Sequence, residues 1–409
     1  MINFSRRASN GKEEKARLSE RFGRSKISRP NGKLIWIHSA SVGEIVSVFP
    51  ILEKLLKDTN ATLLVTTSTV NSAKIINKFN FKRTIHQYAP IDLITCVGRF
   101  INYWNPSLVI WTESELWPNT LNLLQKKNIR HVMLNGRISN KSYNQWKFMK
   151  IITSYLLNGF EFFSVQSVED CKKFKLLGLR NNIILGNLKY SVEKHQFDTM
   201  VLSNLKKTFE NKLIWLAAST HEGEESLAFD VHKIASTIIP NLLTIVAPRH
   251  PERGKKIQSE LISNGAIVAL RSEGQIPDDN TEVYIADTIG EMGLWFSLAK
   301  VVWMGKSIVG KGGQNPIEPS FFKCAIICGN KMDNFRDVTK KMLDANALIQ
   351  VDNVNDLAEK VIFLITKPEK AEDMGNKAYN FVQEEKKVID KVYDNLLPIL
   401  ESLELKGFN

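Results

Sequence analysis

The sequence predicts an α/β protein of two facing Rossmann-like domains, each built on a parallel sheet. Its 409 residues are about twice the common size of a single domain. Short apolar runs alternate with amphipathic segments, which is typical of strands followed by helices. The phrase Lys-Leu-Ile-Trp occurs at 33–36 and again at 212–215, each time followed by a Ser-containing turn and then by glutamate. The repeat indicates that one strand–turn–helix unit is used twice.

The first half is expected to begin with a buried strand after Lys33 and a helix that starts near Val42 and is opened by Glu44. Such a turn places backbone N–H groups and one acid at the mouth of a sheet. Pro50 interrupts this helix and is expected to kink it. Strands and helices then alternate, which implies a parallel sheet with helices on both faces. The expected strands are 61–67, 107–112, 131–135 and 162–167, and the expected helices are 70–78, 91–104, 115–127 and 140–157.

The second half starts after a charged and polar stretch that predicts a linker. Its strands are expected at 242–248, 282–287, 301–305 and 324–329, and the pattern from 353 onward is helical. The expected organisation is a basic segment 1–32, a first domain 33–190, a linker 191–211, a second domain 212–385 and a C-terminal helix 386–409 that packs back on the first domain. Ligands of such sheets bind at the carboxyl ends of strands, so the cleft between the domains is the expected site.

The positive charge of the chain is concentrated at its start. The net charge is +12, and residues 1–33 hold ten Lys and Arg against three Glu. A basic tail suits nucleic acid or an anionic membrane surface, and a solvated terminus is the alternative. The rest of the chain carries mixed charge, without a basic stripe interleaved with aromatic residues. We therefore expect no nucleic-acid partner.

Cysteine and histidine usage argues against a disulfide scaffold and against a zinc protein. The cysteines are Cys96, Cys171, Cys324 and Cys328. They are expected to be reduced core residues of a cytosolic protein. The seven histidines are scattered singly, so no zinc site is expected. No apolar run approaches about 18 residues, and the N-terminus has no apolar h-region, so neither a spanning helix nor a secretion signal is expected.

A glycine-rich loop over 305–316, GKSIVGKGGQNP, follows one of the expected strands. Its start matches the G-x-x-x-x-G-K spacing of a P-loop, but Gly312 stands where Ser or Thr must ligate magnesium. The loop is therefore not expected to belong to an NTPase. Its four glycines, Gly313 among them, and its two lysines suit a backbone that closes on phosphate or sugar. An ordinary mobile loop is the alternative.

Polar side chains are expected at several other strand ends of the second half. Glu318 lies between Pro316 and Pro319, so its carboxylate is aimed, as in acids that grip ribose hydroxyls. Arg249 follows another strand, where a cation can meet phosphate, and a surface turn is the alternative. Glu291 follows a third strand, where helix capping alone accounts for part of the motif. The joint occurrence of these groups favours a binding site.

The candidate acids of the first half are Glu44, Glu113 and Glu115. The sequence Glu-Ser-Glu resembles the paired acids of a metal–nucleotide site, but residues that enter a helix point in diverging directions. With Pro118 close behind, we read Glu115 as near a helix start and expect no metal there. Arg137 lies at the end of another strand of this half.

Ten short motifs occur in order along the chain. They are HSASVGE (38–44), ESELWPN (113–119), NGRIS (135–139), QSVED (166–170), GNLKY (186–190), ASTHEGEE (218–225), APRHPER (247–253), DTIGE (287–291), GGQNPIEP (312–319) and NFRD (334–337). This succession closely resembles the 3-deoxy-D-manno-octulosonic acid (Kdo) transferase family, over about residues 12 to 395. Ten ordered motifs are far more specific than any single glycine loop.

The resemblance implies a two-domain GT-B glycosyltransferase of lipopolysaccharide synthesis. It implies inverting transfer of Kdo from CMP-Kdo to a lipid A precursor of the lipid IVA type, without a metal or other cofactor in the active site. Glu44 is implied to be the general base, with Glu113 or Glu115 nearby. The implied acceptor-binding residues are His38, Ser41, Gly43 and Arg137. The implied donor-binding residues are Ser219, Thr220, Arg249, Gly290, Glu291, Gly312, Gly313, Asn315 and Glu318.

Three departures from the family pattern bear on these expectations. Lys306 stands where the family usually has a second glycine, Gln314 replaces its usual histidine, and the apolar N-terminal anchor is missing. Residues 12–23 resemble the segment just after that anchor. Either the chain as given has been trimmed of that anchor or the protein binds membrane peripherally. We expect peripheral binding to the cytoplasmic face of a bacterial inner membrane through the basic tail. A GT-B transferase that uses another nucleotide sugar is the main alternative, and a preference for CMP over UDP and GDP separates the two.

Overall fold

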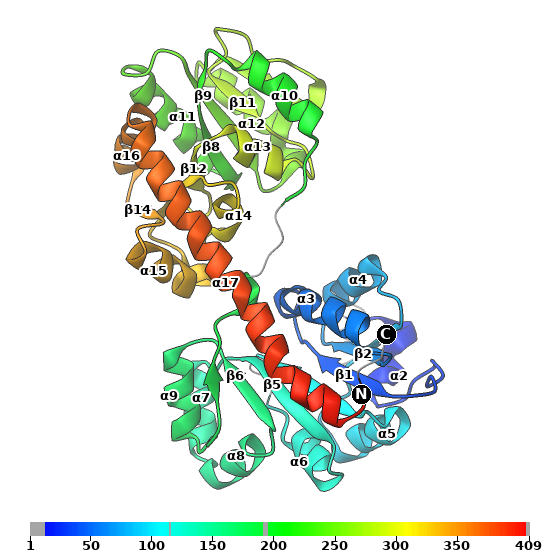
Figure 1. Ribbon diagram of the computed structural model, residues 1–409. Helices are drawn as coiled ribbons and strands as arrows, with labels where there is room; N and C mark the ends of the chain where they lie inside the picture. Colours follow the sequence, from blue (N-terminus) through cyan, green and yellow to red (C-terminus); the bar gives the residue numbers. More distant parts are fainter. Residues whose placement is uncertain (1–12, 114–115, 191–194, 406–409) are drawn as a thin grey trace. The chain divides into compact units, whose positions relative to one another are not determined.

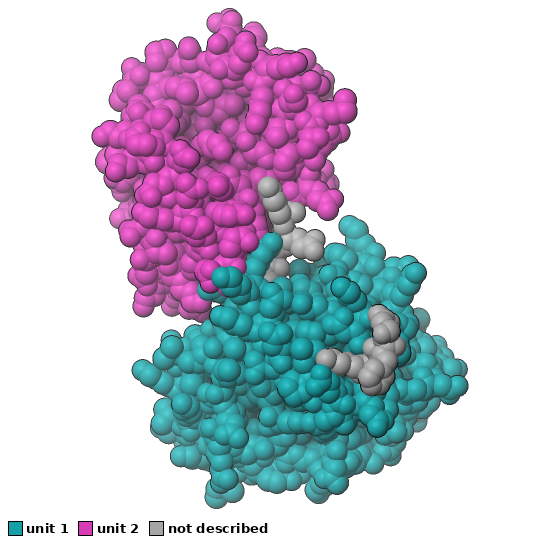
Figure 2. All heavy atoms as spheres, in the orientation of Figure 1, with its two compact units in different colours: residues 1–191, 385–409 teal, residues 192–384 magenta. Residues whose placement is uncertain are grey.

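The computed structural model describes residues 13–113, 116–190 and 195–405. The chain divides into two compact units, residues 1–191 with 385–409 (unit 1) and residues 192–384 (unit 2) (Figure 2). Within the described residues each unit contains a seven-stranded parallel sheet covered by helices (Figure 1). The predicted fold class, two Rossmann-like α/β domains with parallel sheets, is confirmed.

The sheet of unit 1 has the strand order β3-β2-β1-β4-β5-β6-β7. Its strands are β1 (Leu34–His38), β2 (Thr62–Thr67), β3 (Thr84–Tyr88), β4 (Leu108–Thr112), β5 (Arg130–Gly136), β6 (Phe162–Val165) and β7 (Ile183–Ile184). The helices are η1 (Lys15–Arg17), α2 (Leu18–Arg21), α3 (Val42–Asp58), α4 (Val70–Phe79), α5 (Ile94–Trp104), α6 (Pro118–Lys126), α7 (Asn140–Lys147), α8 (Lys150–Leu157), α9 (Val168–Leu176) and η2 (Leu188–Tyr190). Strands β1 and β4 are buried along their whole length, which is why they form unbroken apolar runs.

The sheet of unit 2 has the strand order β10-β11-β9-β8-β12-β13-β14. Its strands are β8 (Leu213–Thr220), β9 (Leu242–Pro248), β10 (Val268–Leu270), β11 (Val283–Ile285), β12 (Val301–Met304), β13 (Ala325–Gly329) and β14 (Ile349–Val351). The helices are α10 (Thr199–Thr208), α11 (Glu224–Ser236), η3 (Pro251–Arg253), α12 (Gly254–Ser263), η4 (Arg271–Glu273), α13 (Met292–Leu298), α14 (Ile317–Ser320), η5 (Asp333–Phe335), α15 (Arg336–Asp344), α16 (Val354–Thr366) and α17 (Pro368–Ser402).

The long C-terminal helix α17 supplies core residues to both units. Ala371 and Met374, near its start, belong to the hydrophobic core of unit 2. Val392 and Leu396, further along, belong to a core of unit 1 that also contains residues of β1 and α3. Burial of these apolar side chains stabilises each end of the helix in its own unit.

The repeated Lys-Leu-Ile-Trp phrase has one structural role in both units. Trp36 on β1 donates an indole hydrogen bond to the hydroxyl of Thr66 on β2, at 2.8 Å. Trp215 on β8 donates the same bond to Thr244 on β9, at 2.7 Å. Both tryptophans are fully buried. In each unit the repeat therefore places a side-chain hydrogen bond between the central strand and its neighbour. This bond satisfies the one polar atom of a buried indole.

Several predicted boundaries differ from the structure. Edge strands β3, β7, β10 and β14 were not expected, because they are short or polar. The expected helix 140–157 is two helices, α7 and α8, separated by Phe148 and Met149. Pro50 lies inside α3, which continues through it to Asp58, and the predicted kink stays a prediction. The linker 191–211 is wrong in its later part, because α10 lies there with Asp198 as its N-cap and is part of unit 2.

The part of the basic N-terminal segment that the structure describes is not a solvated tail. Arg21 is buried and forms an ion pair with Glu13 at 3.0 Å. Arg17 forms an ion pair with Glu20 at 2.9 Å. These arginines are engaged within unit 1, so the expectation that they meet a membrane is wrong for both. The first 12 residues of the segment lie outside the described part. Among the helices of the described ranges, none is both long enough and apolar enough to cross a membrane.

Candidate active site

Glu44 lies in the first turn of α3, beside the carboxyl end of β1. Ser41 is the N-cap: its hydroxyl accepts the Glu44 N–H at 3.3 Å and donates to Glu44 Oε1 at 2.9 Å. The N–H of Ala40 donates to Glu44 Oε2 at 2.8 Å. This capping box holds both carboxylate oxygens, and the hydroxyl of Thr112 also lies 3.4 Å from Oε2, so Oε1 is the oxygen that keeps a lone pair for a proton or a ligand. The residue is 8% exposed, so the carboxylate is fixed near the surface of the sheet edge.

Glu113 directly follows β4 and lies close enough to Glu44 for their charges to interact. Its φ of 59° is in the left-handed region, which is rare outside glycine and concentrates at functional sites. Its Oε1 lies 2.5 Å from Nζ of Lys189. Burial raises the pKa of Glu113; the ammonium of Lys189 opposes this effect, and the charge of Glu44 adds to it.

Lys189 is a candidate site residue that was not expected from the sequence. It lies in the motif GNLKY, where the Asn187 amide donates to Gln166 Oε1 at 3.1 Å. Gln166 in turn donates to the carbonyl oxygen of Asn135 at 3.0 Å. These hydrogen bonds hold the GNLKY segment at the ends of β5 and β6, which places the Lys189 ammonium beside Glu113. The presence of GNLKY among the ten motifs was the available signal.

His38 is a core residue in this structure. Its ring is fully buried and packs against the rings of Trp111 and Trp117, with centroid distances of 4.6 Å to each. Its Nδ1 lies 2.9 Å from the hydroxyl oxygen of Thr66. Burial, with a smaller effect of the Arg21 charge, lowers the pKa of His38 to about 3, so the ring is neutral. The structure thus places His38 in the core, and its part in acceptor binding stays a prediction.

The remaining expected acceptor residues lie at the same sheet edge. Gly43 leaves space that the Lys189 side chain crosses, since a Cβ there would lie 3.7 Å from Lys189 Cε. Arg137 is exposed after β5, and its side chain forms no hydrogen bond or ion pair with a residue that the structure describes. Its charge lowers the pKa of Glu113, so it lies near that carboxyl. Glu115 lies outside the described residues.

Replacing Glu113 by glutamine is expected to raise the melting temperature by a few degrees near neutral pH. The fold raises the pKa of this carboxyl, so its ionisation above the folded-state pKa costs stability. Glutamine removes that cost, and each kcal/mol of added stability raises the melting temperature of a domain of this size by about 2–4 °C. The ammonium of Lys189 remains partly hydrated when its partner is neutral. Calorimetry from about pH 4 to about pH 8 should show the variant's advantage shrinking towards acid. An advantage that is absent, or equal at every pH, contradicts this account.

In unit 2 a second glutamate organises the corresponding edge of the sheet. Glu224 begins α11 and is fully buried. It accepts the backbone N–H groups of His221 (3.0 Å), Lys306 (2.6 Å) and Ser307 (3.2 Å). Burial raises the pKa of Glu224, although these three bonds favour the ionised form. The repeat marked this glutamate as the counterpart of Glu44, but its role was not expected: it joins the β8–α11 turn to the loop after β12.

Basic side chains gather around His221 near the ends of β8 and β9. Burial lowers the pKa of His221, and the charges of Lys306, Arg249 and Arg253 lower it further. Arg253 is already bound to Glu225 through hydrogen bonds of 2.9 and 3.2 Å. Arg249 is exposed, and its side chain has no hydrogen bond or ion pair within the described ranges. Arg249 is therefore available to an anionic ligand.

The backbone at this edge is tightly packed and partly left-handed. Ser219, at the end of β8, has φ of 55°, and Lys306, just after β12, has φ of 58°. Glycine adopts such a backbone without a steric penalty, so both side chains are held in a backbone that favours glycine. A Cβ on Gly305 would lie 2.6 Å from the Ser219 carbonyl oxygen and 2.9 Å from Glu224 Oε2. Thr220 is buried, and its hydroxyl donates to Glu225 Oε1 at 3.0 Å.

The glycine-rich loop packs against neighbouring chain. Gly312 and Gly313 have φ of 106° and 69°. A Cβ on Gly312 would lie 2.4 Å from Asn334 Nδ2, and one on Gly313 would lie 2.3 Å from Met332 Sδ. The N–H of Gly313 donates to the carbonyl oxygen of Lys306 at 2.9 Å. Both positions therefore require glycine, and the loop is held against the segment after β13.

Glu318 is oriented by two partners. Its Oε2 lies 3.1 Å from Nε2 of His195, and its Oε1 accepts from the Asn315 amide at 3.3 Å. The bond to Glu318 raises the pKa of His195. The Glu318 side chain is 27% exposed, so the aimed carboxylate still reaches solvent or a ligand.

The segment after β11 offers backbone rather than a free carboxylate. Glu291 forms an ion pair with Arg271 at 2.9 Å and accepts a hydrogen bond from the hydroxyl of Thr288. The hydrogen bond from Arg271 lowers the pKa of Glu291, and that from Thr288 contributes to the same direction. Gly290 has φ of 89°, and no atom lies within 4 Å of where its Cβ would be. The exposed backbone of Gly290 is the part of this motif that a ligand can approach.

The described residues contain neither a cluster of metal ligands nor an exposed thiol. In the described chain no three His, Cys, Asp or Glu side chains are grouped in a way that could hold a metal ion. All four cysteines are free and buried. Burial raises the pKa of Cys324 and Cys328 to about 12, so neither thiol is ionised near neutral pH.

Comparison with known proteins identifies the family. A family model described as "3-Deoxy-D-manno-octulosonic-acid transferase (kdotransferase)" matches residues 16–192. A 3-deoxy-D-manno-octulosonic acid transferase of Rickettsia bellii is 35% identical over 385 residues, 93% of this chain and 91% of that protein. The chain belongs to this family. The Kdo transferase of Haemophilus influenzae is 30% identical over 391 residues, 94% of this chain and 92% of that protein. The resemblance drawn from the ten motifs is confirmed, and the protein is a glycosyltransferase.

A solved structure supports the architecture of this Kdo transferase. UDP-GlcNAc 2-epimerase from Neisseria meningitidis, bound to UDP-GlcNAc, superposes with a TM-score of 0.58, at 14% identity, over 90% of this chain and 100% of that one. At this identity the likeness shows the fold alone. The two units, each with a parallel sheet, have the GT-B architecture.

The structure places most of the expected residues of this Kdo transferase at the carboxyl ends of its strands. In unit 1 it brings together Glu44, Glu113 and Arg137, from the ends of three adjacent strands. In unit 2 the residues after β8, β9, β11 and β12 lie along one edge of the sheet. This is where ligands of open parallel sheets bind.

Proposed function

We propose that this Kdo transferase moves Kdo from CMP-Kdo to a lipid A precursor of the lipid IVA type, with inversion, in lipopolysaccharide biosynthesis. Membership of the family supports the identity of the transferred sugar. The observation that carries the mechanism is Glu44, a carboxylate held by hydrogen bonds to both oxygens in the first turn of a helix. The proposed donor and acceptor roles of the two units follow from their charged groups.

In this proposal unit 2 binds CMP-Kdo. The phosphate of CMP gains negative charge as its bond to the anomeric carbon breaks, and Kdo itself carries a carboxylate. Arg249 and Lys306 supply positive charge, and the N-terminus of α11 adds a favourable dipole. Glu318, aimed by His195 and Asn315, accepts hydrogen bonds from the ribose hydroxyls.

Unit 1 supplies the base for the attacking hydroxyl. A C–O bond forms between this hydroxyl and the anomeric carbon, the bond to phosphate breaks, and CMP leaves with the electron pair. Glu44 takes the hydroxyl proton. Lys189 balances the charge of Glu113, so two carboxylates can lie near each other. Arg137 remains available for a phosphate of the acceptor.

The proposed function is tested by incubating the protein with CMP-Kdo and a lipid A precursor and weighing the product. The expected product is heavier by whole Kdo residues, with one CMP released for each. CMP should also raise the melting temperature more than UDP or GDP does. A product that forms only with a UDP- or GDP-sugar would overturn the donor assignment in favour of another GT-B transferase.

We also propose that an apolar surface on unit 1 holds the enzyme at an anionic membrane. This surface, the α7–α8 patch, consists of Phe148, Met149, Ile151, Ile152 and Tyr155, all exposed. Lys147 and Lys150 lie within the same stretch and are also exposed. Exposed apolar patches with neighbouring lysines suit insertion into an anionic membrane interface. The patch replaces the basic tail as the main contact, because Arg17 and Arg21 are engaged elsewhere.

Replacing Phe148 and Ile151 together by aspartate is expected to weaken binding to anionic vesicles by at least about tenfold. These side chains are 91% and 88% exposed, so their loss changes little inside the fold. Burying such a side chain contributes roughly 1.5–3 kcal/mol. Co-sedimentation measures the partition coefficient, and Ile276→Asp, on unit 2 and 74% exposed, is the matched control. Equal binding of the double variant and the control would move the membrane contact elsewhere.

A further inference from the structure

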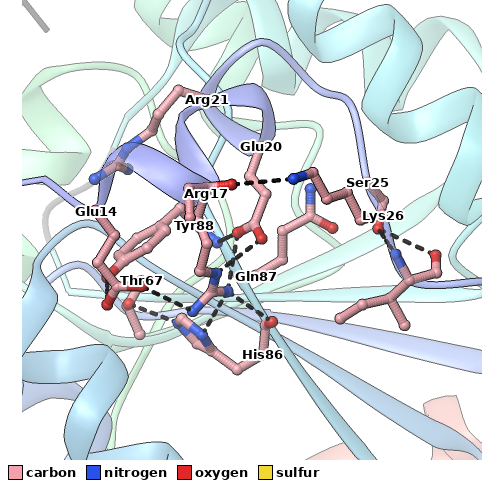
Figure 3. Close-up of polar contacts among 12 residues, drawn as sticks. Glu14, Arg17, Glu20, Arg21, Ser25, Lys26, Thr67, His86, Gln87 and Tyr88 are labelled. Atoms are coloured by element: carbon pink, nitrogen blue, oxygen red, sulfur yellow. Dashed lines mark hydrogen bonds and ion pairs between the residues drawn. The ribbon is translucent and has the colours of Figure 1, made fainter. Parts of the chain in front are cut away.

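Residues 13–22, the N-terminal arm, are fastened to the carboxyl ends of β2 and β3 by two arginines. Figure 3 shows Arg17 and Arg21 on either side of the Tyr88 ring, with guanidinium carbons 4.6 and 4.8 Å from its centroid. Each arginine has an acidic partner within the arm, Glu20 for Arg17 and Glu13 for Arg21. The two arginines differ in what else they bind.

Beyond the arm, and among the residues that the structure describes, Arg17 hydrogen-bonds only to β3. Its Nη2 donates to the carbonyl oxygen of His86 at 3.1 Å and lies 3.1 Å from Nδ1 of the same residue. Burial lowers the pKa of His86 to about 3, and the charge of Arg17 acts in the same direction, so this ring is neutral and its Nδ1 can accept. Arg17 therefore stabilises the edge of the sheet without reaching the turn that carries Glu44.

Arg21 bridges two chain segments at the end of the sheet. Its Nη2 donates to the carbonyl oxygen of Ser68 at 2.7 Å, and its Nη1 donates to that of Ala89 at 3.2 Å. Ser68 lies in the turn between β2 and α4, and Ala89 directly follows β3. Only the planar fork of a guanidinium supplies these bonds together with the paired bonds to Glu13, so lysine cannot replace it.

From Ser68 a short chain of hydrogen bonds leads to Glu44. The N–H of Ser68 donates to the carbonyl oxygen of Ala40 at 3.2 Å. The N–H of Ala40 donates to Glu44 Oε2 at 2.8 Å. Arg21 thus holds the carbonyl of Ser68, the residue whose N–H binds the Ala40 carbonyl, and the N–H of Ala40 orients the carboxylate. Arg21 and Glu13 are 6% and 5% exposed, so solvent screens this linkage little.

We infer that Arg21 of the N-terminal arm is a positioning residue of the transfer site, which fixes the Ala40 amide and through it the carboxylate of Glu44. This inference rests on the proposed function, in which Glu44 takes the proton. Misplacing a catalytic group by about 1 Å costs up to 100-fold in rate. Loss of the Arg21 bridge should therefore lower turnover without touching the donor groups of unit 2.

The test compares Arg21→Lys with Arg17→Lys, a matched change on the same arm. Each variant loses a guanidinium group that pairs with a glutamate and lies over the Tyr88 ring, so both variants should have a lower melting temperature. Arg21→Lys is expected to lower kcat about 10- to 100-fold with an unchanged KM for CMP-Kdo, whereas Arg17→Lys keeps kcat within about threefold. Assays are run well below the melting temperature of either variant. Glu13→Gln, which loosens Arg21 while keeping its side chain, serves if Arg21→Lys does not fold.

A double substitution separates positioning from general stability. In a Glu44→Gln background, Arg21→Lys should lower the residual rate no further, because its effect passes through the lost carboxylate. Equal kcat for the two lysine variants, or an additive effect in the double variant, overturns the inference. If Glu44→Gln alone keeps full activity, the proposed base is wrong. That outcome comes from Glu44→Gln and not from the comparison of the two lysine variants, so failure of the proposed function and failure of this inference can be told apart.

Discussion

Replacing Glu44 by glutamine is expected to lower kcat for Kdo transfer by about 10²–10⁴-fold, the usual effect of removing a positioned general base. Glutamine has the same shape, and its carbonyl oxygen can still accept the Ala40 N–H, so the capping turn should persist. The proposed donor groups lie in unit 2, so affinity for CMP should be unchanged. Kdo transfer under saturating substrates, with CMP binding by calorimetry, measures both quantities.

The competing explanation is that Glu44 only caps α3. A capping acid contributes about 0.3–1 kcal/mol of stability and leaves turnover almost unaffected. Asp170 is a matched control, because it occupies the same position in the capping box of α9 with Ser167 as N-cap. Asp170→Asn should reproduce the stability change without the loss of rate. Activity of Glu44→Gln within about threefold of wild type would transfer the role of base to Glu113 or Glu115.

Replacing Arg249 by methionine is expected to lower kcat/KM for CMP-Kdo roughly 10- to 150-fold. A hydrogen bond to a charged group contributes about 1.5–3 kcal/mol, and Arg249 is the exposed arginine that the structure leaves for a phosphate or carboxylate of the donor. The melting temperature should hardly change, since the side chain has no partner in the described structure to lose. Initial rates over a range of CMP-Kdo concentrations give the value.

Arg253→Met provides the contrast within the same motif. Arg253 is bound to Glu225, which is 3% exposed, and removing it leaves a buried carboxylate without its partner. Breaking such a pair typically costs 3–5 kcal/mol, so this variant should lose stability. If Arg249→Met is as destabilised as Arg253→Met, or keeps kcat/KM within about threefold, Arg249 is a structural residue and the donor anion binds elsewhere.

The central strands of both sheets can be predicted from the sequence because parallel strands buried on both faces must be apolar along their length. β1 and β12 are examples, and the repeated Lys-Leu-Ile-Trp phrase marks the equivalent position in each unit. The edge strands cannot be predicted in this way. β7 has two exposed isoleucines, and β14 has three residues, so each is a strand only because a neighbour pairs with it.

The sequence by itself determined the features of the site that depend on near neighbours. Ser41 and Glu44 are three residues apart, the spacing of a capping box, so the carboxylate's position follows from local backbone geometry. The glycines of the loop after β12 likewise mark positions where a side chain has no room.

Only the tertiary structure decided which distant groups share a charge or a hydrogen bond. Glu224 accepts from Lys306 across 82 positions, and Arg21 donates to Ser68 across 47. Neither pairing has a periodicity that a local pattern can reveal. The physical reason is that burial and electrostatic pairing arise when separate strands end at one edge of a sheet. For the same reason Lys189 meets Glu113 only in the folded unit, where both lie beside the turn that holds Glu44.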